Sequence, residues 1–543
     1  YSLLIVNLVY LRSIGSNDLI PTRPGPVLLS ALFGGIIGYL LSVVLKKLLL
    51  GSASVKPETN KSNPDAFIIP LENENPLILN NIFNGVMIVG QPGSGKTASA
   101  IHPLLYQVVE KDWTGLIYDL KGKLADEVIS CYNSLSDRGN HKTSIKFINF
   151  ANPLKSQRVN PIAPEYMKNK ADVIEFANTL LTNLMATDGS KSEDPFWFNN
   201  ARNILSAVVW FLRNNHPKFC TIPHAIAFIY WKDSDALLET LKSDPESARM
   251  ISTLNASSQA QDKKLFINIL STLYTHLMGL DLPELFFTLS ENEANLNVNS
   301  RENPTLLTIA NYEPLQKVYS PIIAAICNVV TQRMNEEDKL KGIIMFDEFA
   351  SIKIPNFERT PETIRSRGVA TVIALQDKQQ LITKYGDSIA ETIASCLATK
   401  FYFKSTNTKT VEEAVKIFGK RDVKFTTHTN SNIPRMMRLI MKPTAPTVSE
   451  SIQERDYLKI EEITNYERGQ FAGIYSDANV KYGKGQRIKL SLLKERSSLP
   501  TRSDITDALI QDTYKKIYLD IASIFIKKKA KSGVNADDLK VNF

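Results

Sequence analysis

Residues 85–97 read GVMIVGQPGSGKT, and this stretch decides the fold. Residues 86–89 form a short apolar, β-branched run that is typical of a buried parallel strand. They lead directly into residues 90–97, which match the pattern G-x-x-x-x-G-K-[ST] of the Walker A loop. Residues 98–109 then predict a helix whose N-terminus faces a bound anion. A strand, this loop and a helix in that order predict a phosphate-binding site for ATP or GTP.

Each residue type in the loop has a chemical reason. The glycines let the backbone curl so that successive N–H groups point at the β-phosphate. Lys96 reaches the β- and γ-phosphates as a mobile positive charge, and the hydroxyl of Thr97 is a ligand for Mg²⁺. The candidate nucleotide-binding residues are therefore Gly90, Gly93, Ser94, Gly95, Lys96, Thr97 and Ala98.

A second acidic element is needed for the metal, and residues 342–350, GIIMFDEFA, supply it. Residues 343–346 predict another buried strand, with Asp347 and Glu348 at its carboxyl end, where doubly wound sheets place ligand chemistry. We expect Asp347 to hold Mg²⁺ through water and Glu348 to polarise the attacking water. The alternative is a strand that ends in a solvated turn, and the Walker A loop favours the functional interpretation.

Two more residues are candidates for catalysis. The strand predicted over residues 370–375 ends in Gln376, whose amide could contact the γ-phosphate and report its presence. Arg365 lies just upstream, and in ring ATPases such an arginine inserts into the neighbouring subunit's site. Many strands end in glutamine and many arginines lie on surfaces, so neither residue is specific alone.

The N-terminal 50 residues predict a membrane anchor. Residues 27–45, VLLSALFGGIIGYLLSVVL, are apolar and uncharged, and residues 1–11 resemble the end of an earlier, truncated span. Lys46 and Lys47 follow at once, which places the C-terminal side in the cytoplasm. The alternative is a signal peptide, but no A-x-A cleavage pattern follows. Residues 51–64 are rich in polar residues and predict a linker.

Composition narrows the class of protein. The net charge of +8, from 64 basic and 56 acidic residues, is a mild excess of positive charge. It is not the signature of a nucleic-acid-binding tail. Residues 401–500 carry 18 Lys/Arg against 11 Asp/Glu, so this region could meet phosphates, although a solvated face is an equal alternative. The four cysteines lie far apart without metal-binding spacing, which argues against a disulfide framework and suits a reducing compartment.

The pattern between the two Walker elements changes. Residues 65–162 alternate strand and helix, as a parallel sheet requires, whereas the residues from about 170 to 279 have helical periodicity. Phe196, Trp197 and Phe198 could stack on DNA bases, but they are better explained as core anchors. Residues 503–529 predict an amphipathic helix with Ser503 as its cap and Ile505, Leu509, Ile517 and Ile524 as its apolar positions.

Several shorter motifs accompany the Walker elements in order. They are DLKG at residues 119–122, RVNPI at 158–162, DPFW at 194–197 and ARN at 201–203, followed by Asp347, Glu348, Arg365 and Gln376. This ordered set resembles the coupling proteins of type IV secretion systems, the conjugative DNA-transfer ATPases. Lys123 and Asp377 depart from the family pattern, which leaves partner specificity open but touches no Walker residue.

The resemblance implies a RecA-like P-loop core, residues 65–162 and 301–495, with an inserted all-α domain at 163–300 and a tail at 496–543. It also implies a homohexamer at the cytoplasmic face of the bacterial inner membrane. Such proteins receive a relaxase–DNA complex, contact other secretion components and use ATP and Mg²⁺ to drive the substrate into the channel. Arg365 would act in the neighbouring subunit and Gln376 as the sensor, and the basic stretch 420–442 is a candidate for contacting DNA phosphates in the pore.

Two other functions stay open from the sequence. One is a receptor of the same family that passes protein effectors without DNA. The other is a membrane-tethered ATPase that remodels or degrades protein, although the zinc-protease pattern H-E-x-x-H is absent.

Overall fold

The computed structural model describes residues 63–135, 138–185, 195–252, 260–429, 447–489 and 497–531. Contacts divide the chain into two units, Tyr1–Pro64 and Asp65–Phe543, and every described helix and strand lies in the second. The predicted anchor, residues 1–50, lies outside the described residues, as do all but the last two residues of the predicted linker. Among the described helices, none is both long enough and apolar enough to cross a membrane.

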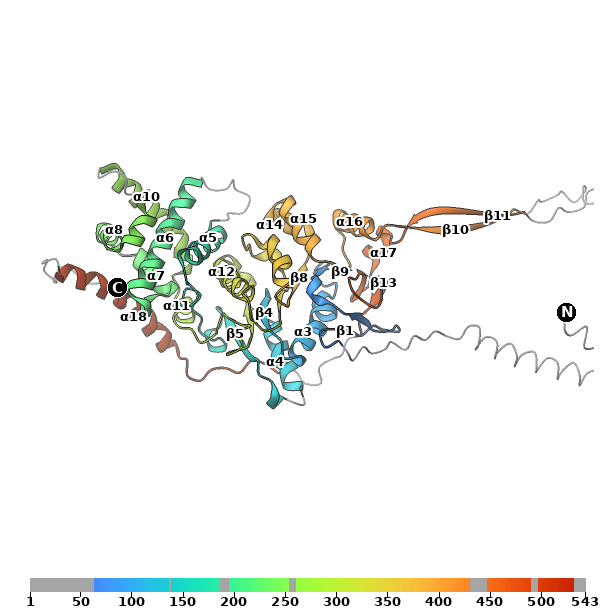
Figure 1. Cartoon of the computed structure of the whole chain (residues 1–543), viewed down its shortest axis with the longest axis horizontal. Helices are drawn as coiled ribbons and strands as arrows, with labels where there is room; N and C mark the ends of the chain where they lie inside the picture. Colours follow the sequence, from blue (N-terminus) through green and yellow to red (C-terminus); the bar gives the residue numbers. More distant parts are fainter. Residues whose placement is uncertain are drawn as a thin grey trace, which may run out of the picture. The chain divides into compact units, whose positions relative to one another are not determined.

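A nine-stranded sheet forms the centre of the described part, in the order β13-β12-β9-β3-β8-β7-β4-β6-β5 (Figure 1). The strands from β9 to β5 run parallel, and β12 and β13 extend the sheet as antiparallel strands. This confirms the predicted α/β class with a large parallel sheet. The bounds are β3 Val86–Val89, β4 Thr114–Asp119, β5 Ser144–Asn149, β6 Thr305–Ala310, β7 Gly342–Phe346, β8 Val369–Leu375, β9 Thr399–Phe403, β12 Gln470–Ile474 and β13 Tyr482–Arg487.

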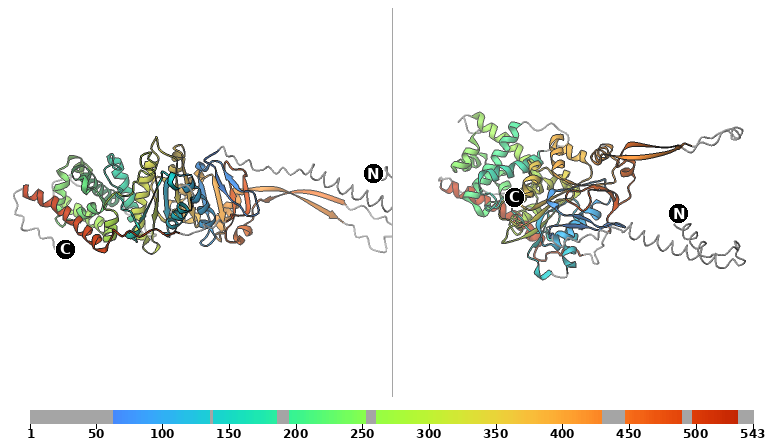
Figure 2. Two further views of the ribbon diagram at one scale, coloured as in Figure 1. Left: turned by 90° about the horizontal axis from the view of Figure 1, so that it is seen from below. Right: turned by 45° about the vertical axis from the view of Figure 1, so that its right-hand side comes forward.

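Alternation along β3 shows why the central strands are apolar throughout. Val86 and Ile88 pack into one hydrophobic core, whereas Met87 and Val89 pack into another on the opposite face. Because both faces are covered, a short unbroken apolar run is the expected sequence for such a strand. Helices lie on both faces of the sheet (Figure 2). The first core contains residues of α3 (His102–Glu110) and α4 (Leu124–Ser134), and the second those of α12 (Gln316–Met334), α14 (Lys378–Tyr385), α15 (Asp387–Cys396) and α16 (Thr408–Phe418).

The strand order decides which side chains can meet. β8 lies between β3, which precedes the Walker A loop, and β7, which precedes Asp347. All three strands are parallel, so their carboxyl ends share one edge of the sheet. The Walker A loop, the acidic pair and Gln376 therefore follow adjacent strands at the same edge.

Between β5 and β6 the described residues form helices and no strand. The long helices α5 (Lys170–Leu184) and α6 (Pro195–Asn215) pack together, and α5 also packs against α12. Trp197 and Phe198 are partly buried against the core, whereas Phe196 is 47 % exposed. Two of the three aromatics are thus anchors. The remaining helices are α7 Ile222–Ile229, α8 Ser234–Lys242, α9 Pro245–Met250, α10 Ala260–Leu277 and α11 Pro283–Thr288.

The C-terminal helix α18 (Asp507–Lys531) packs against α7 and α11 (Figures 1 and 2). Its start differs from the prediction, because the helix begins four residues after Ser503 and the hydroxyl of Thr506 accepts the N–H of Leu509. Leu509 is 42 % exposed and so lies off the buried face. The face that packs contains the predicted Ile517 and Ile524, together with Ile521 and Phe525.

A two-stranded ribbon, β10 (Lys420–Thr429) and β11 (Thr447–Asp456), leaves the body after α16 (Figure 1). At its base Arg421 lies over the ring of Tyr457, and the N–H of Tyr457 donates to the carbonyl of Gly419. The predicted phosphate-contacting stretch 420–442 thus begins on β10, and its residues 430–442 lie outside the described part. Ahead of the sheet, β1 (Phe67–Ile69) and β2 (Leu77–Leu79) form a short hairpin.

Candidate nucleotide-binding site

The Walker A loop leaves the end of β3 and turns sharply before the next helix. Gly93 and Gly95 adopt φ angles of +78° and +97°, which L side chains rarely adopt. A Cβ on Gly95 would also lie 2.7 Å from the backbone nitrogen of Gly469. The loop then enters a π-type turn, Thr97–Ile101, before α3 begins, where the sequence predicted one continuous helix.

Lys96 is held inside this loop. Its ammonium donates to the carbonyl oxygens of Gly90 and Gln91, and the residue is 8 % exposed. Burial lowers the pKa of Lys96, while the nearby carboxylates of Glu348 and Asp347 act in the opposite direction. In the structure, the predicted phosphate-binding lysine therefore lies close enough to the predicted acidic pair for their charges to interact.

The two predicted magnesium ligands are in contact. Thr97 Oγ1 lies 3.2 Å from Asp347 Oδ1, although 250 residues separate them in the chain. Burial raises the pKa of Asp347, and its hydrogen bond with the Thr97 hydroxyl acts in the opposite direction. Hydroxyl and carboxylate oxygens are ligands that Mg²⁺ accepts together with phosphate oxygens, so this pair fits a nucleotide-bound magnesium ion.

Glu348 is oriented by the neighbouring strand. The backbone N–H of Gln376 donates to Glu348 Oε2 at 3.1 Å. The other oxygen, Oε1, is buried and accepts no hydrogen bond within the described residues. Burial raises the pKa of Glu348 to about 7, with the Lys96 ammonium opposing the shift. A buried carboxylate oxygen without a protein donor is well suited to accept a proton from water.

A polar network that the sequence did not indicate lies beneath Glu348. Ser351 Oγ donates to the carbonyl of Glu348 at 2.6 Å and lies 2.7 Å from the hydroxyl of Tyr118. That hydroxyl also accepts from the side-chain amide of Asn311 at 3.0 Å. Tyr118 and Asn311 come from β4 and from the end of β6, so the network ties the acidic turn to two further strands. In the sequence, the only sign of this network is that Tyr118 and Asn311 are polar residues near the end of a strand.

The DLKG motif places two further charged side chains, those of Asp119 and Lys121, at the same edge of the sheet. Asp119 is buried, and its carboxylate accepts the N–H of Lys121 at 3.0 Å, which stabilises the turn after β4. Burial and, to a smaller extent, the nearby Asp347 raise the pKa of Asp119 to about 6. The charge of Lys121 in turn lowers the pKa values of both Asp347 and Lys96. Lys121 is therefore a cation beside the predicted metal site, for which the sequence alone suggested no role.

Arg365 does not join this group within one chain. It is the last residue of α13 (Thr360–Arg365), which precedes β8, whereas Gln376 follows the end of that strand. Seven strand residues at about 3.3 Å each put the two residues at opposite edges of the sheet. Arg365 is exposed. A role in a neighbouring subunit's site stays a prediction.

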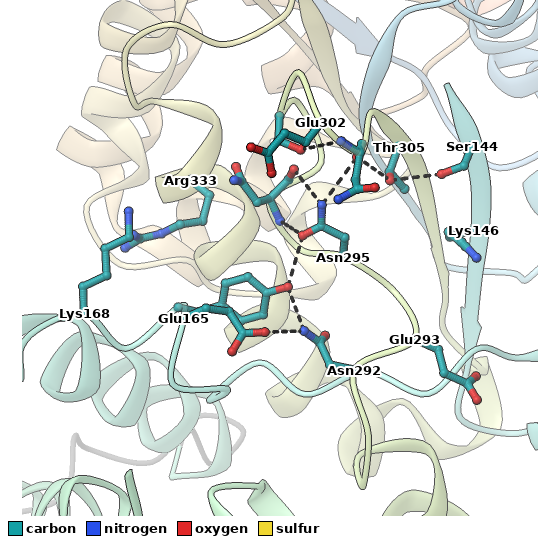
Figure 3. Close-up of a pocket in the computed structure, with 14 residues that line it drawn as sticks. Ser144, Lys146, Glu165, Lys168, Asn292, Glu293, Asn295, Glu302, Thr305 and Arg333 are labelled. Atoms are coloured by element: carbon teal, nitrogen blue, oxygen red, sulfur yellow. Dashed lines mark hydrogen bonds between the residues drawn. The ribbon is translucent and has the colours of Figure 1, made fainter. Parts of the chain in front are cut away.

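A polar cavity of about 540 Å³ lies at that opposite edge, where β5 and β6 begin (Figure 3). Ser144 and Thr305 line it from the first position of each strand, and Asn292 and Asn295 line it from the loop before β6. Its lining contains amides and charges of both signs, and Arg333, on α12, is already paired with Asp172 at 2.8 Å. The cavity is separate from the Walker residues.

The order β9-β3-β8-β7-β4, with the Walker A loop after β3 and an acidic pair after β7, defines a P-loop nucleotide-binding protein. The chain belongs to the type IV secretion-system coupling proteins, since the model of their DNA-binding domain matches residues 74–470. This confirms the family to which the motifs pointed.

Solved structures of the bacterial conjugative coupling protein TrwB share the fold. The unbound monoclinic form of TrwBdeltaN70 has a TM-score of 0.60 at 16 % identity, covering 81 % of this chain and 92 % of that one. TrwB with the ATP analogue ADPNP has a TM-score of 0.58 at 16 % identity, covering 78 % and 89 %. TrwB with ADP and Mg²⁺ has a TM-score of 0.55 at 16 % identity, covering 78 % and 87 %. No curated protein matches the chain in sequence.

Proposed function

We propose that this chain is the ATP-driven coupling protein of a conjugative type IV secretion system, which moves relaxase-bound DNA into the secretion channel. Family membership supports the place in secretion, and the matched model is that of a DNA-binding domain. The observation that carries the ATP-hydrolysing role is the contact of Thr97 with Asp347, next to a buried Glu348 oxygen that accepts no hydrogen bond from the described residues.

In this proposal, Lys96 binds the β- and γ-phosphates, and Thr97 and Asp347 hold the Mg²⁺ that accompanies ATP. The bound metal supplies charge neutralisation for the phosphates. Glu348 accepts a proton from the attacking water, while the N–H of Gln376 keeps its carboxylate in place and the Ser351 network holds its backbone carbonyl. The TrwB structures with ADPNP, or with ADP and Mg²⁺, support the choice of ATP and magnesium.

The proposal extends to assembly and location. The functional form is a homohexamer anchored in the bacterial inner membrane through residues 1–50, with the remainder in the cytoplasm. The family of the chain and the apolar run at residues 27–45 support this placement. A ring would bring the exposed Arg365 of one copy toward the nucleotide of the next, and would let basic residues track DNA phosphates without reading bases.

DNA-stimulated hydrolysis tests the proposal directly. We expect the ATPase rate of the purified chain to rise several-fold with DNA at low salt, and the stimulation to fall as salt increases because phosphate contacts are screened. Steady-state phosphate release measured with single-stranded, double-stranded and no DNA gives the result. Lys96→Ala should abolish hydrolysis under every condition, since it removes the phosphate-binding charge.

The outcomes separate the candidate functions. Turnover near wild type in Lys96→Ala would remove the Walker A loop from the mechanism. Robust hydrolysis without DNA binding or stimulation at low salt would instead favour a receptor for protein effectors that uses the same nucleotide site.

A further inference from the structure

A tight turn that the proposed mechanism does not use lies directly on the Walker A loop. Residues 467–470 connect α17 (Ile460–Asn465) to β12, and the N–H of Gln470 donates to the carbonyl of Glu467 at 3.0 Å. Gly469 has a φ of +85°, as the third position of a type II turn requires. Gly469 is buried, whereas Arg468, at the second position, is exposed. The glycine of the turn is therefore packed inside the protein, and the arginine side chain is exposed to solvent.

The turn is fixed to the loop by backbone contacts. The N–H of Gly469 donates to the carbonyl of Ser94 at 2.8 Å. A Cβ on Gly95 would lie 3.4 Å from Arg468 Cγ, so the stem of the arginine starts beside the loop. A Cβ on Gly469 would lie 3.1 Å from Ser99 Oγ, which leaves little room for a larger residue there. Arg468 is thus held at a defined place next to the phosphate-binding backbone.

The sheet order tells which end of a nucleotide would meet Arg468. Asp347 and Glu348 follow β7, on one side of β3, and so mark the terminal phosphate. β9 and β12 lie on the other side of β3. β12 begins where the antiparallel β9 ends, so the turn lies at the same edge as the Walker A loop. A nucleotide whose terminal phosphate points toward β7 extends its ribose and base toward this turn.

The guanidinium of Arg468 is available for such a contact. Its neighbour Glu467 is paired with Arg487, and Arg468 itself makes no hydrogen bond or ion pair within the described part of the chain. A planar guanidinium stacks on aromatic faces, and a purine base offers such a face. Stacking also tolerates either purine, because it uses the face of the ring and not its edge.

We infer that Arg468 is a nucleotide-binding residue that stacks on the base of the nucleotide held by its own chain. This assignment rests on the proposed function, in that the Walker A loop binds ATP. It predicts that Arg468 contributes to binding of the nucleoside part of the ligand and leaves binding of the phosphates to the loop.

Two ligands separate these contributions. Calorimetric titration of the whole chain with ADP, and separately with inorganic tripolyphosphate, compares a ligand that has a base with one that has only phosphates. For Arg468→Ala we expect about five- to tenfold weaker binding of ADP and unchanged binding of tripolyphosphate. Arg468→Lys keeps the charge but lacks the planar group, so it should recover little of the loss. Arg249→Ala, an exposed arginine on α9, is the matched control and should bind both ligands normally.

Two results would overturn the inference: unchanged ADP binding in Arg468→Ala, or an equal loss for both ligands, which would make Arg468 a phosphate contact. If the wild-type chain bound neither ligand, the proposed nucleotide site itself would fail, and this outcome is seen before any variant is compared.

Discussion

At the scale of single residues, the position of Glu348 makes a sharp prediction. Its Oε2 accepts the N–H of Gln376, and its Oε1 has no partner among the described residues. Glu348→Gln keeps the size and one acceptor oxygen but cannot take a proton. We expect hydrolysis to fall by about 100-fold or more while ATP binding stays near wild type. Single-turnover phosphate release and equilibrium binding measure the two effects.

Hydrolysis within threefold of wild type would exclude Glu348 as the base. Loss of binding together with hydrolysis would instead show that the substitution disturbs the Walker A loop. Asp119→Asn is not a suitable control because Asp119 is buried beside the same site. Glu337→Gln is suitable, since this exposed carboxylate pairs with Arg367 and lies outside the site.

The sequence predicted the Walker residues because their spacing along the chain is fixed by the chemistry of one loop and one strand end. It could not predict that the N–H of Gln376 binds Glu348, since this depends on β8 lying beside β7. The contact of Gly469 with Ser94 joins segments that are far apart in sequence. Such contacts follow from strand order, which a local pattern does not encode.

At the scale of elements, the C-terminal helix α18 shows the same limit. The apolar periodicity predicted the helix, and most of the apolar positions predicted for it are buried, namely Ile505, Ile517 and Ile524. It did not predict the cap at Thr506 or the packing against α7 and α11. The segment before the helix is tied down as well. Arg502 donates to Glu293, which also binds Arg158. Burial raises the pKa of Glu293, but these hydrogen bonds prevail and lower it to about 2.

The contact between α18 and α7 should weaken in acid. His224, on α7, is 6 % exposed, its Nδ1 lies 2.6 Å from Thr221 Oγ1, and its Nε2 lies 3.6 Å from Asp520 on α18. Burial lowers the pKa of His224 to about 4, although Asp520 opposes the shift and Lys516 adds to it. Burial outweighs the acidic partner here, so the folded state holds a neutral imidazole.

Protonation then favours the open helix. Opening returns His224 to its ordinary pKa, so the open state binds more protons between pH 6.5 and 4. The contribution of the neutral His224 to the stability of the packed helix is therefore complete above pH 6.5 and is lost as the pH falls toward 4. We expect the free energy of opening α18, measured by hydrogen exchange, to fall by about 2 kcal/mol between pH 7 and pH 5. His224→Gln should flatten this dependence, and a rise in stability toward pH 5 would show a charged His224–Asp520 pair instead.

At the scale of the whole molecule, the placement of Arg365 separates two ways of completing the site. Within one chain, Arg365 precedes β8 and the Walker residues lie at the other edge of the sheet. The side chain is exposed and cannot reach its own nucleotide across a strand of this length. In a ring, however, the edge of one copy faces the nucleotide of the next, and the arginine would stabilise transition-state charge there.

Mixing two inactive variants tests this arrangement. Glu348→Gln lacks the base and Arg365→Ala lacks the arginine, so each should hydrolyse ATP poorly by itself. In mixed rings, some interfaces combine an intact Glu348 from one copy with an intact Arg365 from its neighbour. We expect an equimolar mixture to recover roughly a quarter of wild-type activity when subunits exchange at random. At an active interface, the copy that holds the nucleotide must have an intact Glu348 and its neighbour must have an intact Arg365, and each condition is met in half of the cases. Phosphate release after co-assembly measures the recovery. Arg367→Ala, two residues away, replaces Arg365→Ala in the control and should be active alone. A mixture no more active than its components would place Arg365 outside the neighbouring site.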